Sequence, residues 1–123
     1  MAERTRRALI VEDMPDLRRL IEMALKNAPF ERVFASDGRE ADEYIQGENF
    51  DFYLIDIELP YINGYVLASR AIEKNPDALV VLTTAYDFQD TLPRTRLSGI
   101  AEIWLKPLSL LKLEKRMACA MQM

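Results

Sequence analysis

Apolar runs and amphipathic stretches alternate along the chain, and this alternation predicts its secondary structure. Five short segments are almost continuously apolar, without the strict alternation of a strand that has one face in water. Such runs are typical of strands covered by helices on both faces. We predict strands over residues 7–11, 32–35, 50–56, 78–84 and 103–105. The strand over 50–56 must end before Pro60, because proline cannot extend a central ladder.

Between these strands, apolar residues recur at steps of three and four, as on the buried face of a helix. Start and stop residues bound four helices at about 15–27, 38–47, 64–74 and 110–120. Another helix is expected in the segment from Asp87 to Leu97. Pro93 falls inside it and would disrupt a helix interior, so we predict a short helix that starts near Thr91.

Five strands alternating with five helices predict an α/β fold with a doubly wound, five-stranded parallel sheet of the flavodoxin-like type. Right-handed crossovers give the strand order 2-1-3-4-5. A length of 123 residues suits a single domain over 1–123, with residues 1–6 as a short solvated N-terminal arm. In this topology, ligands bind at the carboxyl ends of the strands.

Composition narrows the function. The net charge of −4 and the pI of about 4.9 argue against direct nucleic-acid binding, which requires a basic face. No apolar run approaches the roughly 20 residues that cross a bilayer, so we expect a cytoplasmic protein without a membrane partner. The single cysteine, Cys119, rules out an internal disulfide. The absence of histidine excludes imidazole-based metal sites and general bases.

Polar residues end or directly follow four of the predicted strands, where the topology makes them neighbours. Taken singly, each could be a helix cap or a solvated loop end, but together they suggest one site: Glu12, Asp13, Asp56, Thr84 and Lys106. The three carboxylates repel one another and need a cation, and an all-oxygen site favours Mg²⁺ or Mn²⁺. The ammonium and the hydroxyl suit phosphoryl oxygens, and a carboxylate can accept a phosphoryl group.

The same residues form an ordered set of motifs that resembles the receiver domain of two-component response regulators over essentially the whole chain. The motifs are Glu12-Asp13, Asp56-x-x-x-Pro60-x-x-x-Gly64, Thr84-Ala85 and Lys106-Pro107. This resemblance implies that Asp56 is the phosphoacceptor. It implies that Asp13 binds Mg²⁺ directly, that Glu12 acts mostly through water, and that the backbone carbonyl of Glu58 completes the metal ligands.

On the opposite rim, the resemblance implies that Lys106 pairs with the phosphoryl oxygens and that Thr84 moves in to hydrogen-bond one of them. Thr83 competes for the hydroxyl role, but Thr84 ends the apolar run. Thr84 also precedes Ala85, whose small side chain leaves its backbone N–H accessible to a phosphoryl oxygen.

The resemblance further implies a signalling domain, not a conventional enzyme, that catalyses its own phosphorylation and dephosphorylation. The expected donor is a phosphohistidine on a histidine kinase or histidine phosphotransfer protein. The output would be a changed surface around the fourth helix, the fifth strand and the last helix, which binds a downstream protein target or forms a homodimer.

Two positions depart from the family pattern. Ile103 stands where receivers commonly carry tyrosine or phenylalanine, and the adjacent Trp104 must point to the opposite face of its strand. Tyr86 is a second candidate for the missing ring. Glu58 adds negative charge at the mouth of the site, where it and Tyr86 are expected to tune the phosphoryl lifetime. The alternative is a receiver-like interaction module that no longer switches; a flavodoxin or a haloacid-dehalogenase-type phosphatase fits the acidic motifs poorly.

Overall fold

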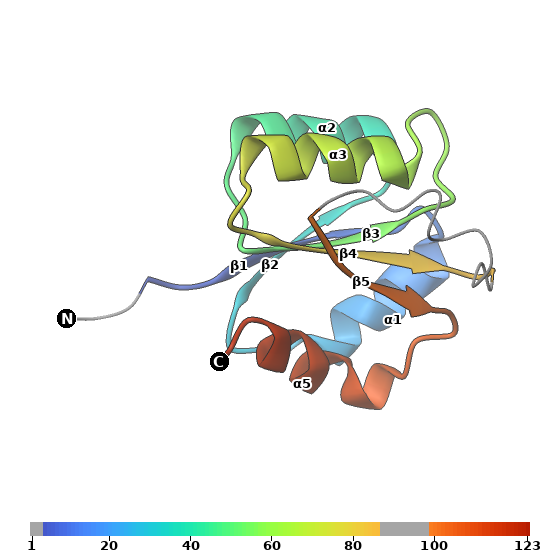
Figure 1. The fold of residues 1–123 in the computed structure, drawn as a ribbon. Coiled ribbons are helices and arrows are strands. Elements are labelled where there is room, and N and C mark those ends of the chain that lie inside the picture. The colour runs from blue at the N-terminus through green and yellow to red at the C-terminus, as the bar shows by residue number, and fades with distance from the viewer. Residues whose placement is uncertain (1–3, 87–98) are drawn as a thin grey trace.

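The computed structural model describes residues 4–86 and 99–123, which form a parallel sheet between two layers of helices (Figure 1). The strand order is β2-β1-β3-β4-β5, as predicted. The strands are β1 (Arg7–Val11), β2 (Glu31–Ala35), β3 (Phe52–Asp56), β4 (Leu79–Thr84) and β5 (Ile100–Leu105).

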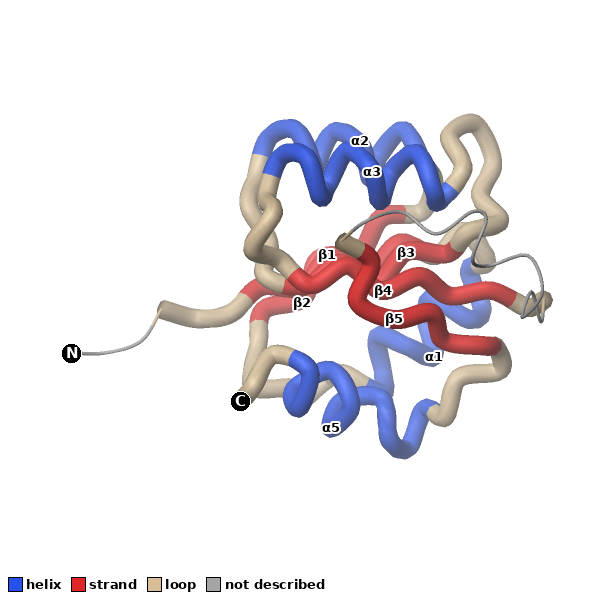
Figure 2. Tube along the Cα trace, viewed as in Figure 1, coloured by secondary structure: helices blue, strands red, loops and turns tan. Residues whose placement is uncertain are grey.

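Helices cover both faces of the sheet. They are α1 (Pro15–Ala24), α2 (Gly38–Gly47), α3 (Gly64–Lys74) and α5 (Leu110–Ala120). Helices α2 and α3 lie on one face and α1 and α5 on the other (Figure 2). The short helix predicted near Thr91 falls in 87–98, outside the described residues.

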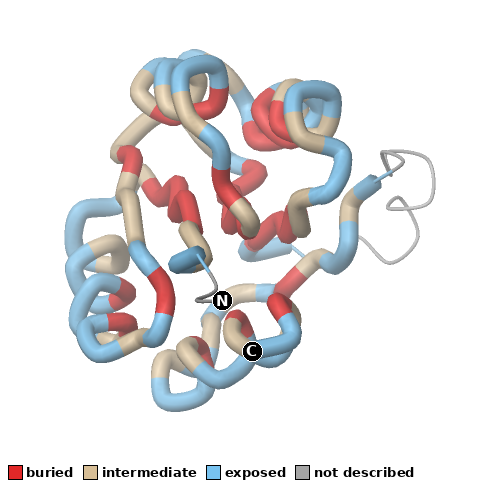
Figure 3. Tube along the Cα trace, turned by 90° about the vertical axis from the view of Figure 1, so that its left-hand side faces the viewer, coloured by how far each residue is buried: buried red, intermediate tan, exposed pale blue. Residues whose placement is uncertain are grey.

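Each face of the sheet carries its own hydrophobic core, so the strands are buried in the middle of the molecule (Figure 3). All five residues of β3 are buried, as expected for a central strand covered on both sides. Neighbouring residues of β3 alternate between the two cores, with Tyr53 on the α2–α3 side and Phe52 on the α1–α5 side. The continuous apolar runs in the sequence therefore reflect two cores, one on each face.

Local signals account for the helix starts. The Asp37 side chain accepts a hydrogen bond of 2.9 Å from the Glu40 backbone N–H and caps α2. Asn63 caps α3 in the same way, accepting from the Val66 N–H at 3.1 Å. Pro15 occupies the first turn of α1, where its missing N–H costs no helical hydrogen bond.

The connection from β3 to α3 is tightly packed at Gly64. A Cβ added there would meet the Asp56 backbone and lie 2.6 Å from the Cα of Ile57. The Gly64 N–H also donates to the Ile57 carbonyl at 3.0 Å. Glycine thus lets α3 begin directly against the end of β3.

The strand β5 is longer than predicted, because it begins at Ile100 and not at residue 103. It lies at the edge of the sheet, with Ala101 and Glu102 exposed, so its first half lacks the apolar signature of a buried strand. Its pairing with β4 also shifts register between Val80 and Val81.

The arm predicted over residues 1–6 contacts the folded body through the part that the structure describes. The Arg4 guanidinium pairs with Asp51, and Arg6 donates to the Met121 carbonyl at 2.7 Å. Within residues 4–86 and 99–123, no helix combines the length and the apolar character that a membrane span requires.

Candidate functional site

Four strands deliver polar residues to one edge of the sheet. Glu12 directly follows β1, Asp56 ends β3, Thr84 ends β4 and Lys106 directly follows β5. The strands are parallel, so their carboxyl ends lie side by side; Asp56 is paired with Thr83 on the neighbouring strand. Each side chain reaches this edge because it ends a strand or directly follows one.

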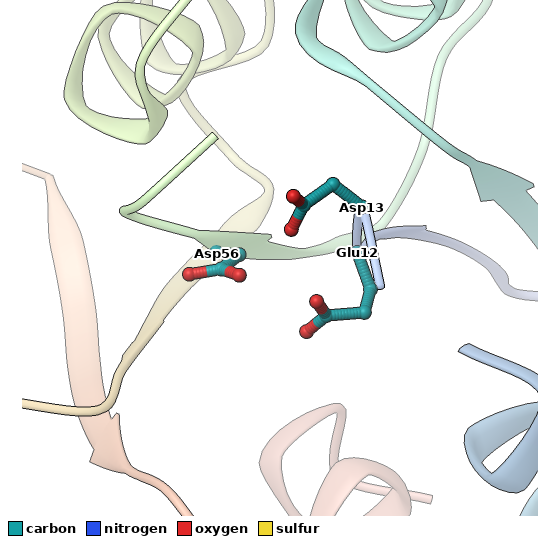
Figure 4. A group of neighbouring side chains, drawn as sticks. All are labelled: Glu12, Asp13 and Asp56. Atoms are coloured by element: carbon teal, nitrogen blue, oxygen red, sulfur yellow. The ribbon is translucent and has the colours of Figure 1, made fainter. Parts of the chain in front are cut away.

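Three carboxylates converge at the centre of this edge. Oxygen atoms of Glu12, Asp13 and Asp56 all lie within 4.8 Å of one another, and the side chains point toward a common region (Figure 4). Glu12 and Asp56 are buried and Asp13 is half-buried. The structure thus brings together the three acidic residues that the sequence selected.

Lys106 joins two of these carboxylates. Its Nζ donates to Glu12 Oε1 and to Asp56 Oδ2, each at 2.9 Å. Backbone amides hold the remaining oxygens, because the Glu58 N–H donates to Asp56 Oδ1 at 3.0 Å and the Met14 N–H to Glu12 Oε2 at 3.2 Å. The Asp56 carboxylate is therefore held in orientation through both of its oxygens.

The pKa values of Asp56 and Lys106 reflect one ammonium that is shared between the carboxylates of Glu12 and Asp56. The pKa of Asp56 is raised to about 6, first by burial and also by the nearby Glu12 charge, against the lowering effect of Lys106 and the Glu58 N–H. Burial alone would lower the pKa of Lys106, but its hydrogen bonds to Glu12 and Asp56 outweigh burial and raise it. The Lys106 ammonium is stabilised by two carboxylates, whereas Asp56 shares this single ammonium with Glu12.

The Glu58 side chain, expected at the mouth of the site, contacts Thr84 and Ala85 at the end of β4. Thr84 Oγ1 donates to Glu58 Oε2 at 2.9 Å, and the Ala85 N–H donates to Glu58 Oε1 at 3.3 Å. Thr84 Oγ1 itself accepts from the Tyr86 N–H at 3.1 Å. The sequence shows a carboxylate two residues after Asp56, but it does not indicate that this carboxylate bonds to Thr84 and Ala85.

Ile103 and Trp104 lie on opposite faces of β5, as predicted. Ile103 packs against the core under α2 and α3. Trp104 is buried in the other core, its Nε1–H donates to Glu102 at 3.0 Å, and the Arg116 guanidinium lies 3.9 Å from its ring centroid. Trp104 therefore cannot replace an aromatic side chain at residue 103. Tyr86 is exposed beside the site.

Comparison with known proteins decides the family. The family model described as the response regulator receiver domain matches residues 8–118. The chain belongs to this family. It is thus a receiver domain of the two-component signalling systems, and response regulators of this kind accept phosphate from histidine kinases.

The chain is similar in sequence to two response regulators of different length. It is 32% identical over 117 residues to the response regulator protein PilR of Pseudomonas aeruginosa, covering 95% of this chain and 26% of that protein. It is also 32% identical to the response regulator receiver protein CpdR of Brucella abortus, covering 85% and 88% of the two chains. The receiver therefore spans about a quarter of one relative and most of the other.

Solved structures share the receiver fold. The response regulator protein TrrA from Thermotoga maritima, solved in complex with Mg(2+)-BeF, is 30% identical, with a TM-score of 0.77 and coverage of 94% of this chain and 98% of that one. The signal receiver domain of a Luxo repressor protein from Vibrio parahaemolyticus has a TM-score of 0.86 at 22% identity, covering 97% and 92%. The second likeness supports the fold alone.

Proposed function

We propose that this receiver domain accepts a phosphoryl group on Asp56 from a histidine kinase or a histidine phosphotransfer protein, in a Mg²⁺-dependent reaction. The observation that carries the proposal is the buried Asp56 carboxylate, held by Lys106 within a cluster of three carboxylates. This arrangement offers a fixed acceptor oxygen, an ammonium beside it and ligands for a divalent cation.

The donor set fits a hard cation. Glu12, Asp13 and Asp56 together bring three carboxylates against one ammonium, an excess of negative charge that a divalent ion would balance. Asp13 and Asp56 would bind Mg²⁺ or Mn²⁺ directly, Glu12 mostly through water, and Glu58 through its backbone carbonyl. The ion, when bound, would neutralise charge on the phosphoryl oxygens.

In the transfer step, an oxygen of the Asp56 carboxylate attacks phosphorus and forms a P–O bond. The P–N bond of the donor phosphohistidine breaks, and its electron pair stays on the imidazole nitrogen, which takes up a proton. Lys106 would stabilise the charge on the phosphoryl oxygens, with the Thr84 hydroxyl and the Ala85 N–H as further donors. Attack of water on the resulting acyl phosphate returns the Asp56 carboxylate and releases phosphate.

The output would be a change of surface. The phosphoryl group carries roughly 1.5 to 2 negative charges in place of the single charge of the Asp56 carboxylate, and this change can bias the loop after β4 through Thr84. The affected surface would include the segment 87–98, outside the described residues, together with β5 and α5. A downstream protein target or a second copy of the chain would bind there.

Incubation with acetyl phosphate and Mg²⁺ tests the acceptor. We expect intact-mass analysis to detect one added phosphoryl group on the wild type, and none on Asp56→Asn or after chelation with EDTA. Asp51→Asn is a matched control, because Asp51 directly precedes β3 at its opposite end and should leave the modification intact. Modification of Asp56→Asn to the wild-type level would overturn the assignment.

A second candidate function is a receiver-like interaction module that no longer switches. Ile103 favours it, because the aromatic side chain that commonly accompanies the threonine movement in this family is absent from that position. The two candidates separate on one comparison: a switching receiver changes its amide chemical shifts on α5 and β5 when Asp56 is modified, and a non-switching module does not.

A further inference from the structure

The Glu58 side chain makes a two-pronged contact with the loop after β4. Its Oε2 accepts a hydrogen bond from the Thr84 hydroxyl at 2.9 Å, and its Oε1 accepts one from the Ala85 N–H at 3.3 Å. These are the two donors that the proposed function assigns to phosphoryl oxygens. The carboxylate thus makes, from within the chain, the contacts that a phosphoryl group on Asp56 would need.

The two anions would compete for the same hydrogens. A hydroxyl has one O–H and a backbone amide one N–H, so a well-formed bond to a carboxylate oxygen leaves no equivalent bond for a phosphoryl oxygen. Both acceptors are anionic and form charge-assisted hydrogen bonds of similar strength. Release of the carboxylate is therefore required before Thr84 and Ala85 can hold the phosphoryl group.

The position of Glu58 in the chain favours this competition. Its backbone N–H donates to Asp56 Oδ1 at 3.0 Å, so the competing side chain is tethered two residues from the acceptor. A tethered group acts at a high effective concentration and needs no affinity of its own to stay near the site. The contact also links the loop after β3 to the loop after β4, which the output is proposed to use.

We propose that the Glu58 carboxylate is an internal competitor of the phosphoryl group, an autoinhibitory contact that lowers the affinity of the Asp56 site for phosphoryl-type anions. This inference rests on the proposed function. It assigns to Glu58 a role beyond its backbone carbonyl, because the side chain holds Thr84 and Ala85 until a phosphoryl group displaces it.

Calorimetric titration with beryllofluoride, an analogue of the phosphoryl group, in the presence of Mg²⁺ tests the competition. Glu58→Ala removes the two hydrogen bonds that beryllofluoride must displace. We therefore expect beryllofluoride to bind Glu58→Ala about tenfold more tightly than the wild type. Glu73→Ala is the matched control, since it removes an exposed carboxylate from α3 and should bind like the wild type. Equal or weaker binding to Glu58→Ala would overturn the inference.

A double-mutant cycle separates competition from simple charge repulsion. Thr84→Val removes the hydroxyl at nearly constant shape, so the gain from Glu58→Ala should shrink in that background. In a Thr84→Ser background, which keeps the hydroxyl, the gain should persist. An undiminished gain in Thr84→Val would mean that Glu58 does not compete for the Thr84 hydroxyl, and would overturn the proposed contact. Thermal unfolding of each variant verifies that it is folded.

Titration of Asp56→Asn alongside these variants separates failure of the proposed function from failure of the competition. If no variant binds beryllofluoride in a manner that depends on Asp56, the proposed function fails and the competition fails with it. If the wild type binds in an Asp56-dependent manner and Glu58→Ala binds no more tightly, the proposed function stands and only the competition is wrong.

Discussion

Lys106 and Asp56 are joined by a hydrogen bond of 2.9 Å although 50 residues separate them in the chain. The same ammonium lies 2.9 Å from Glu12, so one cation connects the ends of β1, β3 and β5. Both carboxylates are buried, and water screens their charges poorly. Lys106 therefore stabilises the fold at the carboxyl ends of these strands, in addition to its role in the proposed chemistry.

Replacing Lys106 by methionine should destabilise the protein, because it leaves two buried carboxylates without their shared partner. Removing one member of a buried ion pair costs about 3 kcal/mol or more, and we expect a loss of about that size at pH 7 in EDTA, measured by urea unfolding. Lys112→Met, which changes an exposed lysine of α5, is the control. A loss as small as that of the control would show that Lys106 does not stabilise the cluster.

The raised pKa of Asp56 predicts a dependence of stability on pH in the metal-free protein. The folded state holds a proton on Asp56 up to about pH 6, whereas an unperturbed aspartate has a pKa of 3.8. Between these two pKa values the folded state binds more protons than the unfolded state. The stability that protonated Asp56 contributes is therefore fully present below pH 3.8 and is lost as the pH rises through about 6. A difference of about two in pKa corresponds to about 3 kcal/mol.

We therefore expect Asp56→Asn to be more stable than the wild type by up to about 3 kcal/mol at pH 7 in EDTA, with the difference vanishing near pH 4. Urea unfolding at a series of pH values measures it. A wild type that is more stable than Asp56→Asn at pH 7 without metal would contradict the raised pKa.

Addition of Mg²⁺ should stabilise the protein, because the ion binds the folded cluster and not the unfolded chain. At a concentration ten times the dissociation constant the gain is about 1.4 kcal/mol, visible as a rise in the melting temperature. Asp13→Asn should reduce this rise, whereas Asp16→Asn, which changes an exposed carboxylate of α1, should leave it unchanged. An equal rise for Asp13→Asn would remove Asp13 from the ligand set.

Gly64→Ala should destabilise the fold by about 2 kcal/mol or more, because the new methyl group must displace the backbone at the end of β3. Gly47→Ala is a matched control, since a Cβ there meets nothing within 4 Å and alanine favours the helix. Comparing urea midpoints of the two variants tests the packing. The displaced backbone belongs to Asp56 and Ile57, so Gly64→Ala should also slow modification by acetyl phosphate.

The sequence was sufficient to predict the sheet, its strand order and the convergence of Glu12, Asp13, Asp56 and Lys106. Glu12, Asp13 and Asp56 end or follow buried apolar runs, and Lys106 follows the short apolar run 103–105. The topology alone places the ends of these strands together. Asp37 and Asn63 were likewise recognisable as helix caps from their position before a helix. The predictable part of the site is the part fixed by strand ends.

The contact of Glu58 with Thr84 and Ala85 was not predictable in the same way. It depends on the path of the loop after β3 and on a side-chain torsion, neither of which leaves a periodic pattern in the sequence. The early start of β5 was missed for a different reason, because Ala101 and Glu102 face solvent at a sheet edge where pairing needs no apolar side chain.

The placement of Trp104 has a practical consequence, because it is the single tryptophan of the chain. Its ring lies in the core beneath α1 and α5, under the Arg116 guanidinium, and on the side of the sheet opposite Ile103. Intrinsic fluorescence therefore reports on the α5 layer. A change in emission when Asp56 is modified would mean that the rearrangement reaches the core under α1 and α5, and constant emission would mean that it leaves this core unchanged.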